Sequence, residues 1–142
     1  MIGLLAALAA SLFAEAALYV NLVEHPARMA CGTEIAIAEW APSYKRATVM
    51  QVFLALLSTL AGLTRFLTGG GALWLWGSLL IASVVPYTLL FVLPTNARLQ
   101  EPERDRGSEE TRTLLDGWAR LHAVRSALGL AAACAFLLAL GG

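Results

Sequence analysis

Hydrophobic residues along this chain gather in four long stretches that are separated by polar segments. The stretches cover residues 2–23, 47–67, 72–93 and 121–140. An α-helix needs about 20 predominantly apolar residues to cross a bilayer, so each stretch is long enough. None of them has the continuous polar face that a helix of a soluble bundle presents to water. The pattern therefore predicts an all-α fold, a four-helix transmembrane bundle in a single domain over residues 1–142.

The polar segment between the first two stretches contains helix signals of its own. Thr33 is a suitable N-cap for a short helix over residues 34–40 that ends before Pro42. Trp40 and Tyr44 each combine an apolar ring with one polar edge, which suits the interface between membrane and water. We therefore expect a short interfacial helix in this first loop.

The segment before the last stretch predicts that the fourth helix extends beyond its membrane span. Ser108 is followed by Glu109 and Glu110. This is typical of a helix start, where a hydroxyl caps free backbone N–H groups and acids meet the positive end of the helix dipole. Apolar residues then recur at helical spacing from Leu114 to Leu121. The fourth helix should thus begin well before residue 121.

Composition agrees with a membrane protein and excludes some partners. Charged residues make up 14% of the chain, against about 25% in soluble domains. The formal net charge is zero, so the chain has no basic field that would attract nucleic acid. Cys31 lies in a polar segment and Cys134 lies deep in the last span, a difference in depth that argues against a disulfide between them.

The basic residues are distributed asymmetrically along the chain. Every Lys and Arg except Arg65 lies in the first loop, the third loop or the start of the fourth helix. The positive-inside rule therefore places these loops in the cytoplasm and both termini outside. Ala14-Glu15-Ala16 resembles a signal-peptide cleavage site, but no basic residue precedes the apolar run, and the run continues past this site. We expect an uncleaved first span in a multi-pass protein of the cell membrane.

A few polar residues interrupt the apolar spans. Glu15 lies in the middle of the first span, and Asn21 lies near its end. Because an ionisable group at membrane depth is costly, we expect Glu15 to face other helices as a neutral carboxylic acid with one interhelical hydrogen bond. A role in proton handling is the alternative reading of this residue.

The fourth helix carries the most informative polar pattern. Trp118, His122, Arg125 and Gly129 recur three or four residues apart and so form one stripe along the helix. In the predicted topology, polar side chains from all four helices lie toward the same cytoplasmic end: His25, Lys45, Gln51, Asn96, His122 and Arg125. Snorkelling at the interface explains Lys45. It explains His122 and Arg125 less well, because apolar residues surround both, and we therefore place the candidate site here.

The residue types in this group favour acid–base chemistry over a metal centre. Catalytic zinc typically has three protein ligands, whereas the chain has two histidines and neither an HxxxH nor a CxxC motif. A histidine titrates near neutral pH, and an arginine can stabilise an anionic oxygen or an enolate. In a largely apolar bundle, such groups suit an aromatic, membrane-soluble substrate. The pattern is compatible with proton abstraction before a reaction with oxygen.

Five motifs resemble those of a domain-of-unknown-function family that includes the anthrone oxygenases. They span nearly the whole chain in the family's order and four-helix layout: His25-Pro26, Trp40-x-Pro42-x-Tyr44-Lys45-Arg46, Pro86-x-Thr88, Pro94-Thr95-Asn96-x-x-Leu99 and Trp118-x-x-Leu121-His122-x-x-Arg125. The resemblance implies His25, Asn96, Trp118, His122 and Arg125 as shared positions. It also implies oxidation of anthrones to anthraquinones by molecular oxygen without a flavin or haem. Glu15 matches no position of the family pattern.

The residues and the resemblance together give one leading hypothesis. The protein is a membrane oxygenase for an aromatic or quinone-type substrate, with oxygen as co-substrate and no further cofactor. His25 or His122 is the base, and Arg125 and Asn96 stabilise the enolate. The residues expected to bind the substrate are Trp118, Tyr44, Gln51 and Trp40.

The alternative hypothesis is a non-enzymatic membrane protein that binds a lipid-like ligand or a protein partner. In that case the polar cluster only ties the helix ends together. A self-contained transporter is less favoured, because four spans contain no pair of discontinuous helices. Gly62 and Gly129 are compatible with close helix packing in a homodimer.

Overall fold

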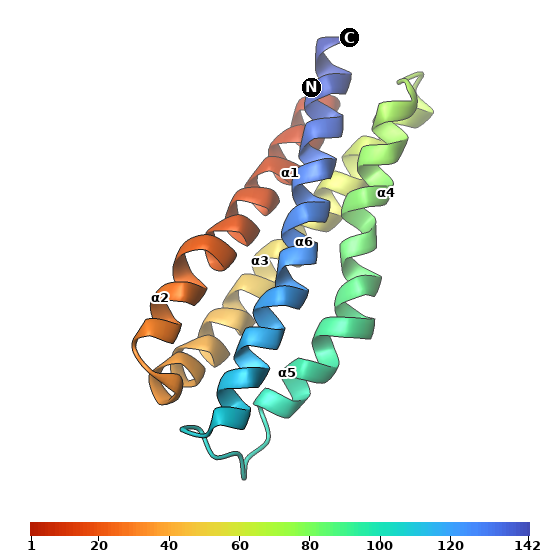
Figure 1. The fold of residues 1–142 in the computed structure, drawn as a ribbon. Helices are drawn as coiled ribbons and strands as arrows, with labels where there is room; N and C mark the ends of the chain where they lie inside the picture. Colours follow the sequence, from red (N-terminus) through yellow and green to blue (C-terminus); the bar gives the residue numbers. More distant parts are fainter.

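The computed structural model describes residues 1–142 and consists of helices that form four rods (Figure 1). The first rod contains α1 (Ile2–Tyr19), the π-helical turn η1 (Val20–Glu24) and α2 (His25–Ala30). The second rod is α3 (Thr33–Leu67). The third contains α4 (Ala72–Tyr87), the π-helical turn η2 (Thr88–Val92) and α5 (Leu93–Leu99), and the fourth is α6 (Glu109–Gly141).

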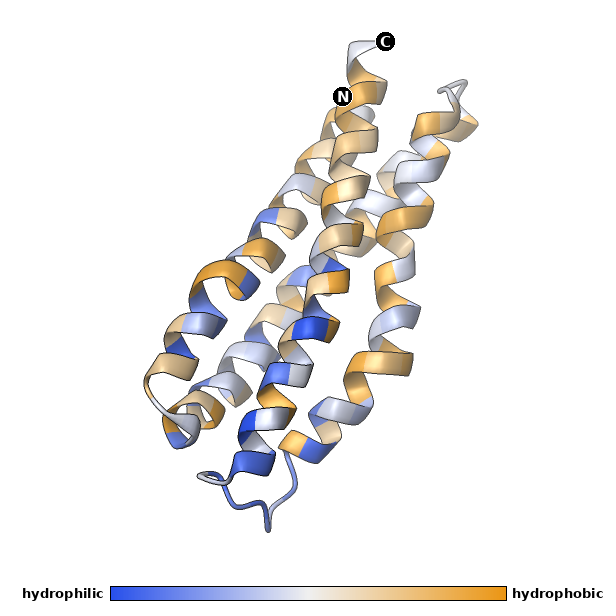
Figure 2. Ribbon diagram, in the orientation of Figure 1, coloured by the Kyte–Doolittle hydropathy of each residue, from blue (hydrophilic) through white to orange (hydrophobic).

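The predicted four-helix architecture is confirmed. Each of the four rods is long and apolar enough to cross a membrane. Large hydrophobic side chains such as Leu8, Leu56 and Leu138 are exposed on the outside of the bundle, where lipid would be their natural surroundings. Figure 2 shows that hydrophilic residues gather toward the end with α2 and the loop before α6, whereas the opposite end is mostly hydrophobic.

The rods form a ring in which each packs against two neighbours. α1 packs against α3 and α6, and α4 packs against the same two helices from the other side. One core cluster fills the bundle at the end with the chain termini and contains Phe13, Trp74, Phe136 and many alanines. A second cluster lies at the polar end and contains Trp40 and Trp118. The candidate site is built on this second, aromatic cluster.

Two proline-containing rods continue as helices through wider turns. η1 immediately precedes α2, which contains Pro26 near its start, and η2 immediately precedes α5, which contains Pro94 in the same place. A proline lacks the N–H of a normal helical bond, and its ring clashes with the preceding turn. A π-helical turn relieves this conflict by locally widening the helix. The predicted span ends at residues 23 and 93 therefore fall inside longer helical rods.

The prediction of a separate interfacial helix over residues 34–40 is wrong. α3 is continuous from Thr33 to Leu67, with Pro42 inside it. Ala36, Ile37 and Trp40 are buried before the proline, and Gln51 and Ala55 are buried after it. Packing on both sides of Pro42 thus stabilises one long helix despite the missing hydrogen bond.

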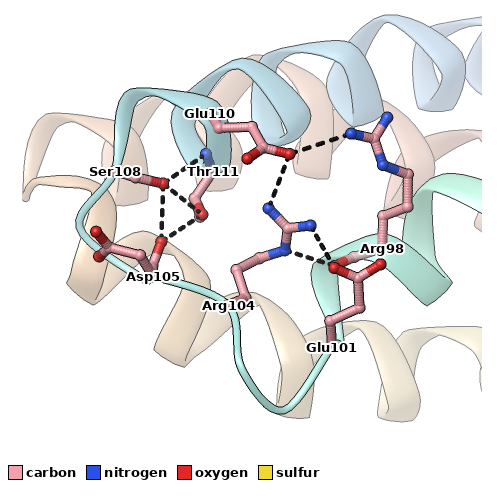
Figure 3. Close-up of polar contacts among 7 residues, drawn as sticks. All are labelled: Arg98, Glu101, Arg104, Asp105, Ser108, Glu110 and Thr111. Atoms are coloured by element: carbon pink, nitrogen blue, oxygen red, sulfur yellow. Dashed lines mark hydrogen bonds and ion pairs between the residues drawn. The ribbon is translucent and has the colours of Figure 1, made fainter.

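The start of α6 agrees with the prediction of an extended fourth helix. The Ser108 hydroxyl caps the helix by accepting a 3.2 Å hydrogen bond from the Thr111 backbone N–H. Figure 3 shows the adjoining ion pairs, in which the Glu110 carboxylate lies 3.2 Å from Arg98 and 3.4 Å from Arg104. These contacts tie the end of α5 to the first turn of α6.

Several side-chain placements differ from expectation. Trp40 was expected at the interface but is 0% exposed, because its ring packs between other aromatic side chains of the second cluster. Glu15 was expected to face other helices but is exposed on the outer side of α1, since small residues such as Ala14 and Ala17 occupy the buried side. Gly62 lies against Phe136 and Gly129 against Phe13, so both glycines serve packing within one chain.

A pair of glycine substitutions in α6 tests this packing. A Cβ added at Gly129 would lie 2.6 Å from the Phe13 ring, whereas one added at Gly117 would meet nothing within 4 Å. Gly129→Ala should lower stability, because overpacking costs about 1–3 kcal/mol, and Gly117→Ala should raise it by about 0.5–1 kcal/mol, because alanine favours the helix. Thermal unfolding in detergent measures both. Equal shifts in the same direction would contradict the packing described.

Candidate functional site

The stripe predicted on α6 faces the inside of the bundle. Trp118, His122 and Arg125 are 3%, 3% and 4% exposed. Gly129 continues the stripe into the first core cluster, where it allows Phe13 to approach α6 closely. The spacing of three and four residues places all four residues on the buried face, as the sequence indicates.

A hydrogen-bond network from Asn21 holds His122 in one orientation. The Asn21 side-chain NH2 donates to the Ala119 carbonyl oxygen at 2.9 Å, so its Oδ1 faces the other way. Oδ1 lies 2.7 Å from His122 Nδ1 and also accepts from the Ser126 hydroxyl at 2.7 Å. Because a carbonyl oxygen only accepts, Nδ1 must carry the proton of this hydrogen bond. In the neutral imidazole, Nε2 is then the atom with the free lone pair.

Asn21 is a residue that sequence reasoning recorded but did not assign to the site. It lies in the π-helical turn η1, the widened segment that precedes the His25-Pro26 pair. An isolated amide near the end of an apolar span was the available signal, because a buried amide in a membrane helix usually bonds to another helix. Its contacts to α6 could not be derived from its own helix alone.

Arg125 is held by Gln51 of α3. An Arg125 Nη2 group donates to Gln51 Oε1 at 2.7 Å, and Gln51 is 2% exposed. The Arg125 Nε and the Gln51 Nε2 atoms are buried without a hydrogen-bond partner. The two side chains therefore retain buried donors without an acceptor.

Aromatic rings connect the two histidines. The Trp118 ring centroid lies 4.9 Å from that of His122 in a stacked arrangement and 5.6 Å from that of His25. Trp40 contacts the Trp118 ring edge-on at 5.9 Å, and Tyr44 stacks on Trp40 at 5.3 Å. The structure thus brings both predicted histidines to the same indole ring. Their imidazoles do not bond to each other.

His25 and Asn96 are buried without hydrogen-bond partners. His25 is 5% exposed and neither ring nitrogen has a partner. Asn96 lies on α5 between the buried residues Val92 and Leu99, and both polar atoms of its amide are unpaired. Neither residue lines the two cavities at His122 and Arg125. Lys45 is exposed and lines a separate groove beside the loop after α5.

A second buried arginine was missed by sequence reasoning. Arg28 forms ion pairs with Glu24 and with Glu39, the latter at 2.7 Å. The Ser43 hydroxyl donates to the Glu24 carboxylate at 2.6 Å and completes the network. The signal was present as Glu24 and Arg28 four residues apart, a spacing that favours an ion pair on one helix face. The position of α3 beside α2 could not be read from that spacing.

Two adjoining cavities share several of these residues. The inner one is a small chamber of about 10 Å³, room for about one water molecule, and is lined by Trp118, His122, Arg28 and Arg125. A larger cavity of about 150 Å³ lies between α3 and α4, with the Phe13 ring and the side chains of Val84 and Leu89 in its wall. Tyr44, Thr48, Gln51 and Arg125 line both. The larger volume is below the range of about 300–1,000 Å³ that is typical of small-molecule sites, so a ligand of that size must displace side chains that line the cavity.

The arrangement defines a class of small all-helical protein with an imidazole and a guanidinium beside an apolar cavity. No group of three or more His, Cys, Asp or Glu side chains is close enough to hold a metal ion. A family model described as "Anthrone oxygenase" matches residues 40–135, and the chain belongs to this family. No curated protein and no solved structure matches it significantly.

Most of the candidate site residues lie inside the region that the family model matches. It includes Gln51, Asn96, Trp118, His122 and Arg125. Asn21 and His25 lie before it, on the first rod. The contact between Asn21 and His122 therefore joins a residue outside the matched region to one inside it.

Two asparagine substitutions test the network at His122. Asn21→Ala leaves His122 Nδ1 without its acceptor and Ser126 with only a 3.4 Å bond to the His122 carbonyl oxygen, and a buried polar group left unpaired costs about 1–3 kcal/mol. Asn96→Ala removes the same atoms from a side chain without hydrogen bonds and should lower stability less. Thermal unfolding of both variants in the same detergent provides the comparison. An equal or larger loss for Asn96→Ala would argue against the network.

Proposed function

We propose that the protein oxidises a planar aromatic substrate of the anthrone or quinone type with molecular oxygen. Family membership supports this class of reaction. The single observation that carries the proposal is the orientation of His122, whose Nδ1 is held by Asn21 while the ring lines the inner chamber. Nε2 then acts as a general base on the edge of a ligand that enters from the larger cavity and widens this small chamber.

His122 is the better candidate for the base than His25. It lines the chamber together with Arg125, and Asn21 determines which nitrogen holds the proton. His25 contacts Trp118 and supports the position of that ring. We therefore assign proton abstraction to His122 and a positioning role to His25.

Arg125 stabilises the negative charge that forms when the proton is removed. Its guanidinium lines both cavities and is oriented by Gln51. Positioned donors that face a developing oxyanion or enolate in an apolar surrounding are among the strongest catalytic contributions. We assign this role to Arg125 with Gln51 instead of Asn96, which lines neither cavity.

The reaction balances with oxygen as the only oxidant. His122 Nε2 takes a proton from the acidic CH2 group of an anthrone and leaves an enolate. The enolate carbon transfers electrons to O2 and forms a C–O bond, and the proton returns to the outer oxygen to give a hydroperoxide. Loss of the second C–H proton and cleavage of the O–O bond then release water and leave a carbonyl. The sum is one anthrone and one O2 to one anthraquinone and one water.

The cavity between α3 and α4 is the entrance for this substrate. Its wall is mainly apolar, with Tyr44, Thr48, Gln51 and Arg125 at the inner end. Such a lining lets an apolar ring system enter from the bilayer while its polar edge reaches Arg125. Trp118 lines the inner chamber, and Trp40, which lines neither cavity, supports the Trp118 ring edge-on.

Oxygen consumption with an anthrone tests the proposed function. His122→Ala should lower kcat by about a hundredfold to ten-thousandfold, the usual contribution of a general base. His25→Ala should retain more activity than His122→Ala, because His25 acts only through Trp118. The measurement needs a rate without protein, since anthrones also react slowly with oxygen alone. Equal rates for folded wild-type protein and His122→Ala would refute the assignment.

The same variants separate catalysis from the alternative function. If the polar cluster only ties helices together for a non-enzymatic protein, both histidine variants should lose folded protein. Well-folded variants without activity would favour catalysis. Size-exclusion profiles and thermal unfolding in detergent distinguish these outcomes.

We further propose that the end with the site faces the cytoplasm of a multi-pass cell-membrane protein. Cys31 is exposed at this end, between α2 and α3, and the hairpin before α4 lies at the other end of the bundle. In a Cys134→Ser background, an impermeant maleimide should label Cys31 only after the cells are permeabilised. With Cys31 also replaced by Ser, Gly71→Cys in the hairpin should react in intact cells. The reverse pattern would show the opposite orientation.

A further inference from the structure

Arg125 is a buried cation without a negatively charged partner in the protein. It is 4% exposed, its Nη2 bonds to the neutral amide of Gln51, and its Nε has no partner. The ion pairs of the structure involve Arg28, Arg98 and Arg104, and none involves Arg125. The charge of this guanidinium is therefore not balanced by any carboxylate.

The other buried arginine provides a comparison within the same chamber. Arg28 is 5% exposed and lies between the carboxylates of Glu24 and Glu39. Both arginines line the inner chamber, but only Arg125 also lines the cavity between α3 and α4. The chain thus neutralises the arginine that is turned away from the entrance and leaves the one at the entrance unpaired.

Groups around Arg125 do not replace the missing counter-ion. Tyr44 and Thr48 line its cavities with neutral hydroxyl groups, and His122 is held in the chamber as a hydrogen-bonded imidazole. A buried charge is normally paired, because it loses its hydration and gains nothing in return when it is alone. The compensating charge must then come from what occupies the cavity.

We infer that the site takes its ligand as an anion, a flat apolar molecule whose ionised oxygen pairs with Arg125. The oxygen belongs to a carboxylate or to an acidic phenol, and both offer the same charged acceptor. The apolar wall of the cavity between α3 and α4 holds the ring system. This inference rests on the proposed function only in placing an aromatic ligand in that cavity, and it narrows the substrate to acidic members of the class.

Binding of ligands that cannot be oxidised tests the inference without catalysis. One pair of probes is an anthraquinone carboxylate and its carboxamide, and a second pair is an acidic hydroxyanthraquinone and its methyl ether. Isothermal titration with the protein in nanodiscs should show about tenfold tighter binding of the anion in at least one pair, the difference expected between a charge-assisted and a neutral hydrogen bond. Equal affinities in both pairs would overturn the inference.

Variants on α6 locate the source of the preference. Arg125→Gln should remove it, and Arg125→Lys should retain part of it because the charge remains. Arg120→Gln is the matched control, since Arg120 is exposed on the same helix and its loss should leave the preference unchanged. A preference that survives in Arg125→Gln would overturn the assignment to Arg125.

Stability of the ligand-free protein gives a second readout. Arg28→Met strands two carboxylates and should lower the unfolding temperature, whereas Arg125→Met removes an unpaired charge and should lower it less or raise it. The opposite order would show that Arg125 is already compensated and would overturn the inference.

The binding and activity measurements together separate this inference from the proposed function. Anion-selective binding without oxygen consumption would leave the inference in place and refute the proposed function. Oxygen consumption together with equal affinities in both probe pairs would support the proposed function and overturn the inference.

Discussion

The hydrogen bond between Asn21 and His122 is the contact on which the site depends. It joins the first and fourth rods at the level where the apolar core gives way to the aromatic one. Without water, a polar side chain between helices must find its partner on another helix. Asn21 satisfies this condition for Ala119, His122 and Ser126 together. One amide thereby links the two helices and determines the tautomer of the imidazole.

The two halves of the bundle meet different physical demands. Toward the chain termini, alanines and glycines let the helices approach closely around Phe13, Trp74 and Phe136, and polar groups are few. Toward the polar end, Trp40 and Trp118 belong to the aromatic cluster, and Trp118 lines the small chamber. The π-helical turn η1 lies between these halves and carries Asn21. Local widening of a helix is often found at functional sites.

Much of the architecture could be predicted from the sequence because it follows from local patterns. The four spans, the Ser108 cap and the inward stripe of Trp118, His122 and Arg125 depend only on hydropathy and on helical spacing. The predictions that were wrong or incomplete all concern residues whose structure depends on contacts with other helices. Packing on both sides keeps α3 continuous through Pro42, and the choice of buried face turns Glu15 outward. Arg28 and Asn21 acquire their roles from partners on other helices, which no single-helix pattern reveals.

The most direct measurement is the protonation of the His122 ring in the resting protein. Nitrogen NMR of protein with isotopically labelled histidine reports which ring nitrogen carries the proton. A neutral His122 should hold its proton on Nδ1, with Nε2 unprotonated, and the variant Asn21→Ala should lose this single-tautomer signal. A resting His122 protonated on Nε2, in wild-type protein, would contradict its role as a base held by Asn21.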